Sequence, residues 1–134
     1  AAANPHVIWL DWVDSDELPA LVAGHDVCLG IFGTTPKASR VVPNKVYQGA
    51  AAGCAIVTSD TPPQRRTLGD GAVFVPAGDD AALAAALTSL ASDSPRLAAL
   101  RSAARARALE RFTASAIVEP LLARLRAEAT STNS

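Results

Sequence analysis

The chain has 134 residues, of which 49% are hydrophobic and 19% are charged. This length and composition fit one soluble domain and exclude a second complete hydrophobic core. Twelve basic and thirteen acidic residues give a formal charge of −1, which favours neither nucleic acid nor an anionic membrane surface as a partner. Any anion-binding site must therefore be local.

The two cysteines, Cys28 and Cys54, lie in apolar stretches and lack the spacing and the neighbouring histidines of a metal site. We expect buried, reduced thiols and hence a cytoplasmic location. The apolar stretches are too short to cross a bilayer, and no signal-peptide pattern opens the chain. The chain also starts without the turn and capping residues that usually begin a domain, so we expect it to be part of a longer protein.

Strands and helices are predicted to alternate in the first part of the chain. Residues 6–13, rich in β-branched and aromatic side chains, predict a strand. Asp14 and Glu17 are spaced like a capping box for the helix that follows, which should end at Gly24. The other predicted strands are 27–32, 54–58 and 72–76, and the other helices are 44–52, after Pro43, and a short one capped by Thr61 and Gln64.

From Asp79 onward the apolar residues recur with a helical period, which predicts three final helices. Pro120 predicts a kink or break in the last of them. We expect residues 1–128 to form the domain and residues 129–134 to be a disordered tail.

This order of elements predicts an α/β fold: a Rossmann-like parallel sheet with flanking helices, right-handed crossovers and three C-terminal helices. In such sheets ligands bind at the carboxyl ends of the strands, where a loop meets the next helix. The polar loop over residues 33–43 is the predicted binding site.

Three basic residues approach the start of the helix at 44–52. Lys45 lies in its first turn, where the helix dipole disfavours a cation by roughly 0.3–1 kcal/mol. Lys37 and Arg40 precede it in the loop, and Thr34 and Thr35 add hydroxyl donors. Any one of these cations alone is best explained as a solvated surface charge. Together with the free helix N–H groups they predict a phosphate or diphosphate site.

Other patterns do not indicate catalysis. Residues 14–16 match the Asp-x-Asp pattern of a metal site, but Asp and Ser are common at helix starts, so we expect caps and no metal. His6 and His25 have no predictable carboxylate partner.

The sequence does not assign the remaining arginines to a site. Arg65 and Arg66 follow a strand and could face the cleft, although surface charge is the simpler interpretation. The arginine-rich helix over residues 96–111 is most simply a solvated face.

Three segments, 30–38, 43–48 and 51–58, resemble the C-terminal, donor-binding half of GT-B glycosyltransferases, especially the retaining enzymes of family 4. Residues 9–13 and 17–21 resemble the segment that precedes that site in the family. The resemblance extends from Val7 to Leu125 and implies one half of a two-domain architecture whose N-terminal acceptor domain is absent here.

The resemblance implies roles for the loop and helix residues. Lys45 would stabilise the departing diphosphate as the catalytic group. Many relatives carry two glutamates eight residues apart where this chain has Arg40 and Gln48, so a ribose contact through the Gln48 amide is retained but a carboxylate role is not. The residues implied in donor binding are Gly33, Thr34, Thr35, Lys37, Arg40, Asn44 and Gln48.

The expected function is transfer of a sugar from a nucleotide diphosphate sugar to an unknown acceptor, without a metal or other cofactor and without nucleic acid. The isolated segment should be inactive, and any membrane contact, at the inner face, should be made by the missing half. Two alternatives remain open: a nucleotide-sugar 2-epimerase-like isomerase, which shares the two-domain fold, and a noncatalytic nucleotide-sugar-binding module. Fold alone does not distinguish them.

Overall fold

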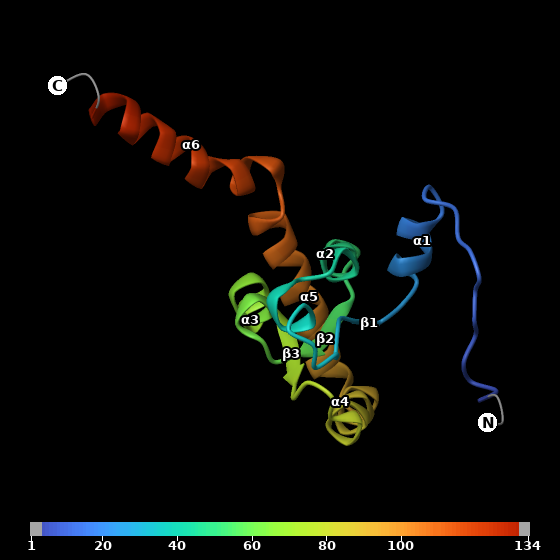
Figure 1. The fold of residues 1–134 in the computed structure, drawn as a ribbon. Coiled ribbons are helices and arrows are strands. Elements are labelled where there is room, and N and C mark those ends of the chain that lie inside the picture. Colours follow the sequence, from blue (N-terminus) through green and yellow to red (C-terminus); the bar gives the residue numbers. More distant parts are fainter. Residues whose placement is uncertain (1–3, 132–134) are drawn as a thin grey trace.

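The computed structural model describes residues 4–131 and contains a three-stranded parallel sheet flanked by helices (Figure 1). The strands are β1 (Val27–Leu29), β2 (Ala55–Ser59) and β3 (Ala72–Val75), in the spatial order β1-β2-β3. Cys28 is aligned with Ile56, and Val57 with Val73. The helices are α1 (Leu18–Ala23), α2 (Asn44–Ala51), α3 (Pro62–Leu68), α4 (Asp80–Ser92), α5 (Ser94–Arg111) and α6 (Ala114–Ser131), with 3₁₀ turns η1 (Ala38–Arg40) and η2 (Gly69–Gly71).

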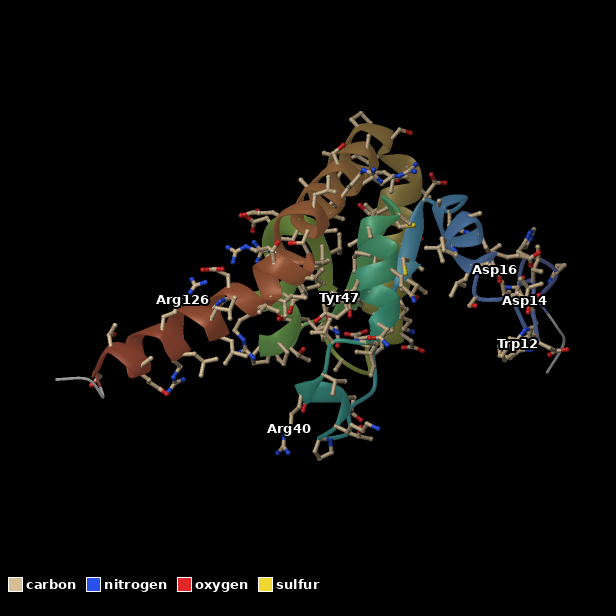
Figure 2. All side chains as sticks on the ribbon, turned by 90° about the horizontal axis from the view of Figure 1, so that it is seen from above. Trp12, Asp14, Asp16, Arg40, Tyr47 and Arg126 are labelled. Atoms are coloured by element: carbon tan, nitrogen blue, oxygen red, sulfur yellow. The ribbon has the colours of Figure 1, made fainter. Side chains whose placement is uncertain are left out.

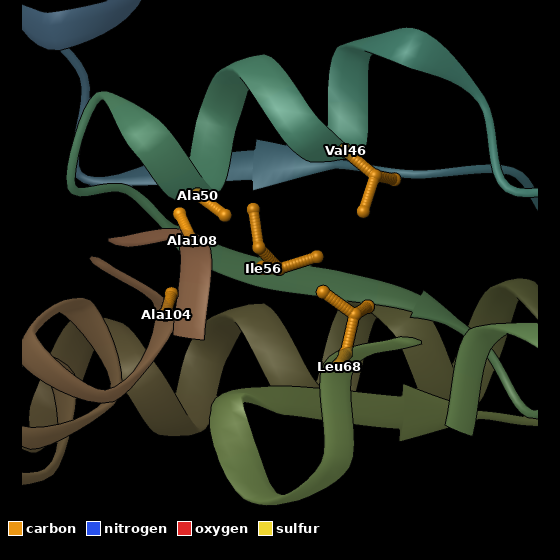
Figure 3. Close-up of a cluster of buried hydrophobic side chains, with 6 residues drawn as sticks. All are labelled: Val46, Ala50, Ile56, Leu68, Ala104 and Ala108. Carbon is orange, nitrogen blue, oxygen red and sulfur yellow. The ribbon is translucent and has the colours of Figure 1, made fainter. Parts of the chain in front are cut away.

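The central strand β2 is buried along its whole length, with helices on both faces of the sheet. Ile56 belongs to a core cluster with side chains of α2, α3 and α5 (Figure 3). Val57 points to the opposite face, because side chains alternate along a strand, and packs with Val75 and Leu90 of α4. The continuously apolar sequence of this strand is thus explained by burial on both faces, and the predicted α/β architecture with three C-terminal helices is confirmed.

The prediction of a strand over residues 6–13 is wrong. Among residues 4–131 this segment has no strand partner, and it runs outside the sheet (Figure 1). Ile8, Trp9 and Trp12 are more than 80% exposed. The indole N–H groups of the two tryptophans donate to nearby carboxylates, Trp9 to Asp11 at 2.8 Å and Trp12 to Asp14 at 2.9 Å. A β-branched and aromatic composition becomes a strand only where a neighbouring strand can accept its backbone hydrogen bonds.

Helix α1 ends at Gly24, as predicted, but the capping at two helix starts differs from the prediction. Asp14 accepts a hydrogen bond from Trp12 instead of capping α1, which starts at Leu18 without a side-chain cap. The hydroxyl of Thr61 likewise makes no cap hydrogen bond at the start of α3.

The end of the chain is more helical than predicted. Helix α6 runs through Pro120 as one helix and extends to Ser131, so the chain does not break there. Residues 129–131 are therefore helical rather than part of a tail, and residues 132–134 lie outside the described residues. The loss of one backbone hydrogen bond at Pro120 is tolerated inside an otherwise complete helix.

Three arginines of α5, Arg101, Arg105 and Arg107, bind backbone carbonyls of neighbouring elements and so are more than a solvated face, contrary to the sequence-based interpretation. Arg107 donates from Nε to the carbonyl of Thr67 and from Nη2 to that of Arg66, at 2.8 and 2.9 Å. These carbonyls lie in the last turn of α3, where backbone acceptors lack intrahelical partners and the dipole is negative. Arg107 therefore caps the C-terminus of α3.

Two further arginines of α5 hold the end of α2 in the same way. Arg105 donates to the carbonyl of Ala51 at 3.1 Å, and Arg101 donates to that of Gly53 at 2.8 Å. Arg101 also pairs with Asp26, just before β1, at 2.7 Å. One helix thus fixes the C-terminal ends of α2 and α3, and the N-termini of those helices lie at the other end, toward the carboxyl edge of the sheet.

Close packing between α2 and β1 depends on Gly49. A Cβ atom at this position would lie 2.6 Å from both Cβ and Sγ of Cys28. Cys28 donates its thiol to the carbonyl of Lys45 at 3.4 Å, and Cys54 lies fully buried against carbonyls of α1 and His25. Both cysteines are free thiols, as predicted, although Cys28 is only half-buried.

We predict that Arg107→Ala lowers the free energy of unfolding by about 1–3 kcal/mol, because two carbonyls lose a charged donor. Urea denaturation provides the measurement. Arg111→Ala is the matched control, since Arg111 is exposed and its ion pair with Glu110 is long, at 3.5 Å. Equal effects of the two substitutions would contradict the capping role.

Burial raises the pKa of the Cys54 thiol above its ordinary value of 9.0. Below that value the thiol is protonated in both the folded and unfolded states. Above it the unfolded state loses its proton first, so stability falls as pH rises toward the folded pKa. We expect the urea midpoint to fall between about pH 8 and about pH 10, and Cys54→Ala to reduce this decrease. An identical pH dependence in the variant would refute the assignment to this thiol.

Candidate functional site

The loop between β1 and α2 lies at the carboxyl edge of the sheet. Backbone hydrogen bonds extend the β1–β2 pairing into it, with Ser59 donating to Ile31 at 3.1 Å. Gly78, after β3, donates to Phe32 at 2.9 Å. The start of the loop is therefore fixed between the ends of β2 and β3, as expected for a ligand-binding edge of a parallel sheet.

Gly30 allows the start of this loop to pass close to the Thr58 side chain of β2. A Cβ atom there would overlap the Thr58 hydroxyl. That hydroxyl accepts a hydrogen bond from the backbone N–H of Ile31 at 3.3 Å. A larger residue at Gly30 would move the loop away from β2.

The turn η1 is held by hydrogen bonds within the loop. The hydroxyl of Thr35 accepts from the N–H of Ala38 at 3.2 Å, and Ser39 donates its hydroxyl to the carbonyl of Pro36 at 2.8 Å. Ala38 is buried, while Gly33 and Thr34 are exposed. Thr35 therefore stabilises the shape of the loop, and its hydroxyl is engaged within it.

Three cations surround this loop without acidic partners. Lys37, Arg40 and Lys45 are exposed, and none forms an ion pair within residues 4–131. Lys45 is the second residue of α2 and Asn44, also exposed, is the first. Arg40 lies at the outer tip of the loop and points away from α2 (Figure 2). The positive charge at the helix start is thus carried by Lys45, with Arg40 farther out.

Gln48 lies one turn after Lys45 and on the same side of α2. It lines a groove of about 420 Å³ between α1 and α2, whose walls are mostly apolar and include Leu18, Val22 and the stem of Arg105. A groove of this size can hold a small planar group, and the Gln48 amide offers both a donor and an acceptor at its edge.

Sequence reasoning missed the arrangement that follows β2. Arg65 binds Asp60 with two hydrogen bonds, at 2.6 and 2.7 Å, and its guanidinium lies 4.5 Å from the centre of the Phe74 ring. The hydrogen bond from Arg65 holds the pKa of Asp60 below its ordinary value. Arg65 is exposed but paired, whereas Arg66 is exposed and contributes its carbonyl to Arg107.

Three polar side chains near the end of β2 are buried. Ser59, Thr61 and Gln64 are 1%, 6% and 0% exposed. Their hydroxyl and amide atoms have no hydrogen-bond partner among the described residues. The Thr61–Gln64 spacing predicts a helix cap instead. The only sequence signal of a different role is that Gln64 falls on the same helix face as Leu68, the face that is buried.

The described residues contain no group of three or more His, Cys, Asp and Glu side chains placed to hold a metal ion. The acidic residues of 14–16 are exposed at the approach to α1, and His25 is bonded through Nδ1 to the carbonyl of Leu21 at 2.7 Å. Within residues 4–131, no helix combines the length and apolarity that crossing a membrane requires.

Comparison with known proteins bears on the family and the fold of this chain. A family model described as glycosyl transferase-like matches residues 3–123. Among solved structures, the fold matches sucrose-phosphate synthase from Thermosynechococcus elongatus with a TM-score of 0.71 and 19% sequence identity. The alignment covers 91% of this chain and 30% of that enzyme, so the chain spans less than a third of its length. No curated protein sequence gives a significant match.

The sheet order and flanking helices therefore correspond to part of a GT-B enzyme. The family model extends over most of the chain, including the candidate loop, α2 and the buried strand β2. The chain belongs to the glycosyl transferase-like family.

Proposed function

We propose that this chain is the donor-binding half of a glycosyltransferase that uses a nucleotide diphosphate sugar. The observation that carries the proposal is Lys45 in the first turn of α2, at the carboxyl edge of the sheet. This cation is exposed and has no ion-pair partner in the part of the chain that the structure describes. A cation in this position opposes the helix dipole, and a diphosphate would offset the resulting repulsion.

Departure of the diphosphate defines the chemical role of this site. When the bond between the sugar and the diphosphate breaks, negative charge increases on the leaving oxygen. Lys45 and the N-terminal N–H groups of α2 would stabilise that charge by electrostatics, without a proton transfer. The proposed mechanism relies on these protein groups for positive charge and assigns no step to a metal.

The nucleoside would extend from the diphosphate along α2. Gln48 would contact the ribose hydroxyls, and the base would enter the apolar groove between α1 and α2. Asn44, Gly33, Thr34 and Lys37 would surround the diphosphate and the sugar, with Thr35 shaping the loop. Arg40 points outward here, so its contact with the donor would require a change in the loop.

We predict that Lys45→Ala, made in the whole protein, lowers kcat by about 100-fold or more, because a preorganised charge at the leaving group is lost. Steady-state kinetics with the nucleotide sugar measure this effect, and circular dichroism should show an unchanged fold because Lys45 is exposed.

Arg124→Ala provides the control for net charge, since it removes one exposed positive charge from α6, which extends away from the sheet (Figure 1). It should leave kcat unchanged. Equal activity of wild-type protein and Lys45→Ala would exclude the leaving-group role, even if donor binding persisted.

A further inference from the structure

A second polar site lies next to the candidate loop, on α3. Gln64 is fully buried, and neither atom of its amide has a hydrogen-bond partner within residues 4–131. The hydroxyl of Thr61, three residues earlier, is buried and without a partner in the same part of the chain. Buried amides and hydroxyls are nearly always hydrogen-bonded, because removing them from water without a partner is unfavourable.

Thr61 and Gln64 belong to the start of α3, a helix that lies against the loop. Helix α3 contacts η1 directly, and η1 lies within the loop over residues 33–43. Leu68, one turn after Gln64, packs in the core with Val46 of α2. Residues four apart share one face of a helix, so Gln64 faces α2 and the loop that precedes it.

Ser59 does not belong to this pair. It follows the alternation of β2 onto the face of Val57, which packs with α4, whereas Ile56 marks the face covered by α2 and α3. The site therefore consists of Thr61 and Gln64.

The chemistry of the pair suits a neutral polar ligand. The amide provides donors and an acceptor, and the hydroxyl provides one of each. The neighbouring charges of Asp60 and Arg65 pair with each other, so neither of them is free to bind a phosphate beside Thr61 and Gln64. Adjacent hydroxyls of a sugar match such a set, because each hydroxyl both donates and accepts.

We propose that Thr61 and Gln64 form the subsite for hydroxyl groups of the transferred sugar, next to the diphosphate site at Lys45. This inference rests on the proposed function and adds a residue-level determinant of sugar binding. The pair is covered in this structure, so a sugar reaches it when the loop over residues 33–43 moves. The sugar hydroxyls then supply the missing hydrogen bonds, so donor binding favours the moved position of the loop.

The test uses near-isosteric substitutions in the whole protein. Gln64→Leu and Thr61→Val remove the hydrogen-bonding groups while keeping the approximate shape. Thr67→Val is the matched control, because Thr67 lies on the same helix and is partly exposed, and its hydroxyl is not among the buried atoms that lack a hydrogen-bond partner. Calorimetry measures binding of UDP-glucose against UDP, and of GDP-mannose against GDP.

We expect Gln64→Leu to weaken binding of the nucleotide sugar by about tenfold and to leave binding of the matching nucleotide diphosphate unchanged. Thr61→Val should act in the same direction, and the double variant should lose less than the sum of the two, because both groups bind the same ligand. The Tm of the unliganded Gln64→Leu protein should rise, since an unpaired buried amide is removed. Thr67→Val should change neither affinity.

The contrary outcomes separate the two proposals. A wild-type protein that binds none of the four ligands would overturn the proposed function. A wild-type protein that binds nucleotide sugars, combined with unchanged affinity in Gln64→Leu and Thr61→Val, would overturn the sugar subsite alone. Equal weakening of nucleotide sugar and nucleotide diphosphate, with a lower Tm, would show a structural role and would also overturn it.

Discussion

The capping of α2 and α3 by arginines of α5 is the constraint on which the candidate site depends. Arg101 and Arg105 hold the end of α2, and Arg107 holds the end of α3. Each guanidinium binds carbonyls at the negative end of a helix dipole, where a cation is favoured. Because the same helix fixes both C-termini, the two N-termini are set side by side at the carboxyl edge of the sheet, where Lys45 and Thr61 lie.

This constraint also explains why a small-residue core suffices. Ala50, Ala104 and Ala108 contribute little apolar area each, but they let α2 and α5 approach the sheet closely. The close approach brings the arginine stems over the ends of the neighbouring helices. Side-chain hydrogen bonds from α5 then fix the orientation of α2 and α3. Packing between alanines alone would not fix it, because alanine side chains are too small to interdigitate.

The parts of the fold that could be predicted from the sequence are those controlled by local patterns. The continuous apolar run of β2 and the helical period after Asp79 each gave the correct element, because burial on two faces and amphipathic helices leave clear periodic signals. The prediction of a strand over residues 6–13 is wrong because a strand needs a partner strand, and composition does not reveal whether one is present. The roles of Arg101 and Arg107 were missed because their acceptors lie 48 and 40 residues away in sequence.

The candidate site shows the same division between local and nonlocal information. Lys45 could be placed at a helix start from Pro43 and the apolar period alone, whereas Gln64 looked like a cap because its burial depends on η1 and α2. The resulting edge has a charged part on the loop after β1 and a neutral polar part after β2. A ligand with an anionic end and a polyhydroxylated end fits this division, since each part of the edge would bind the group whose chemistry matches its own.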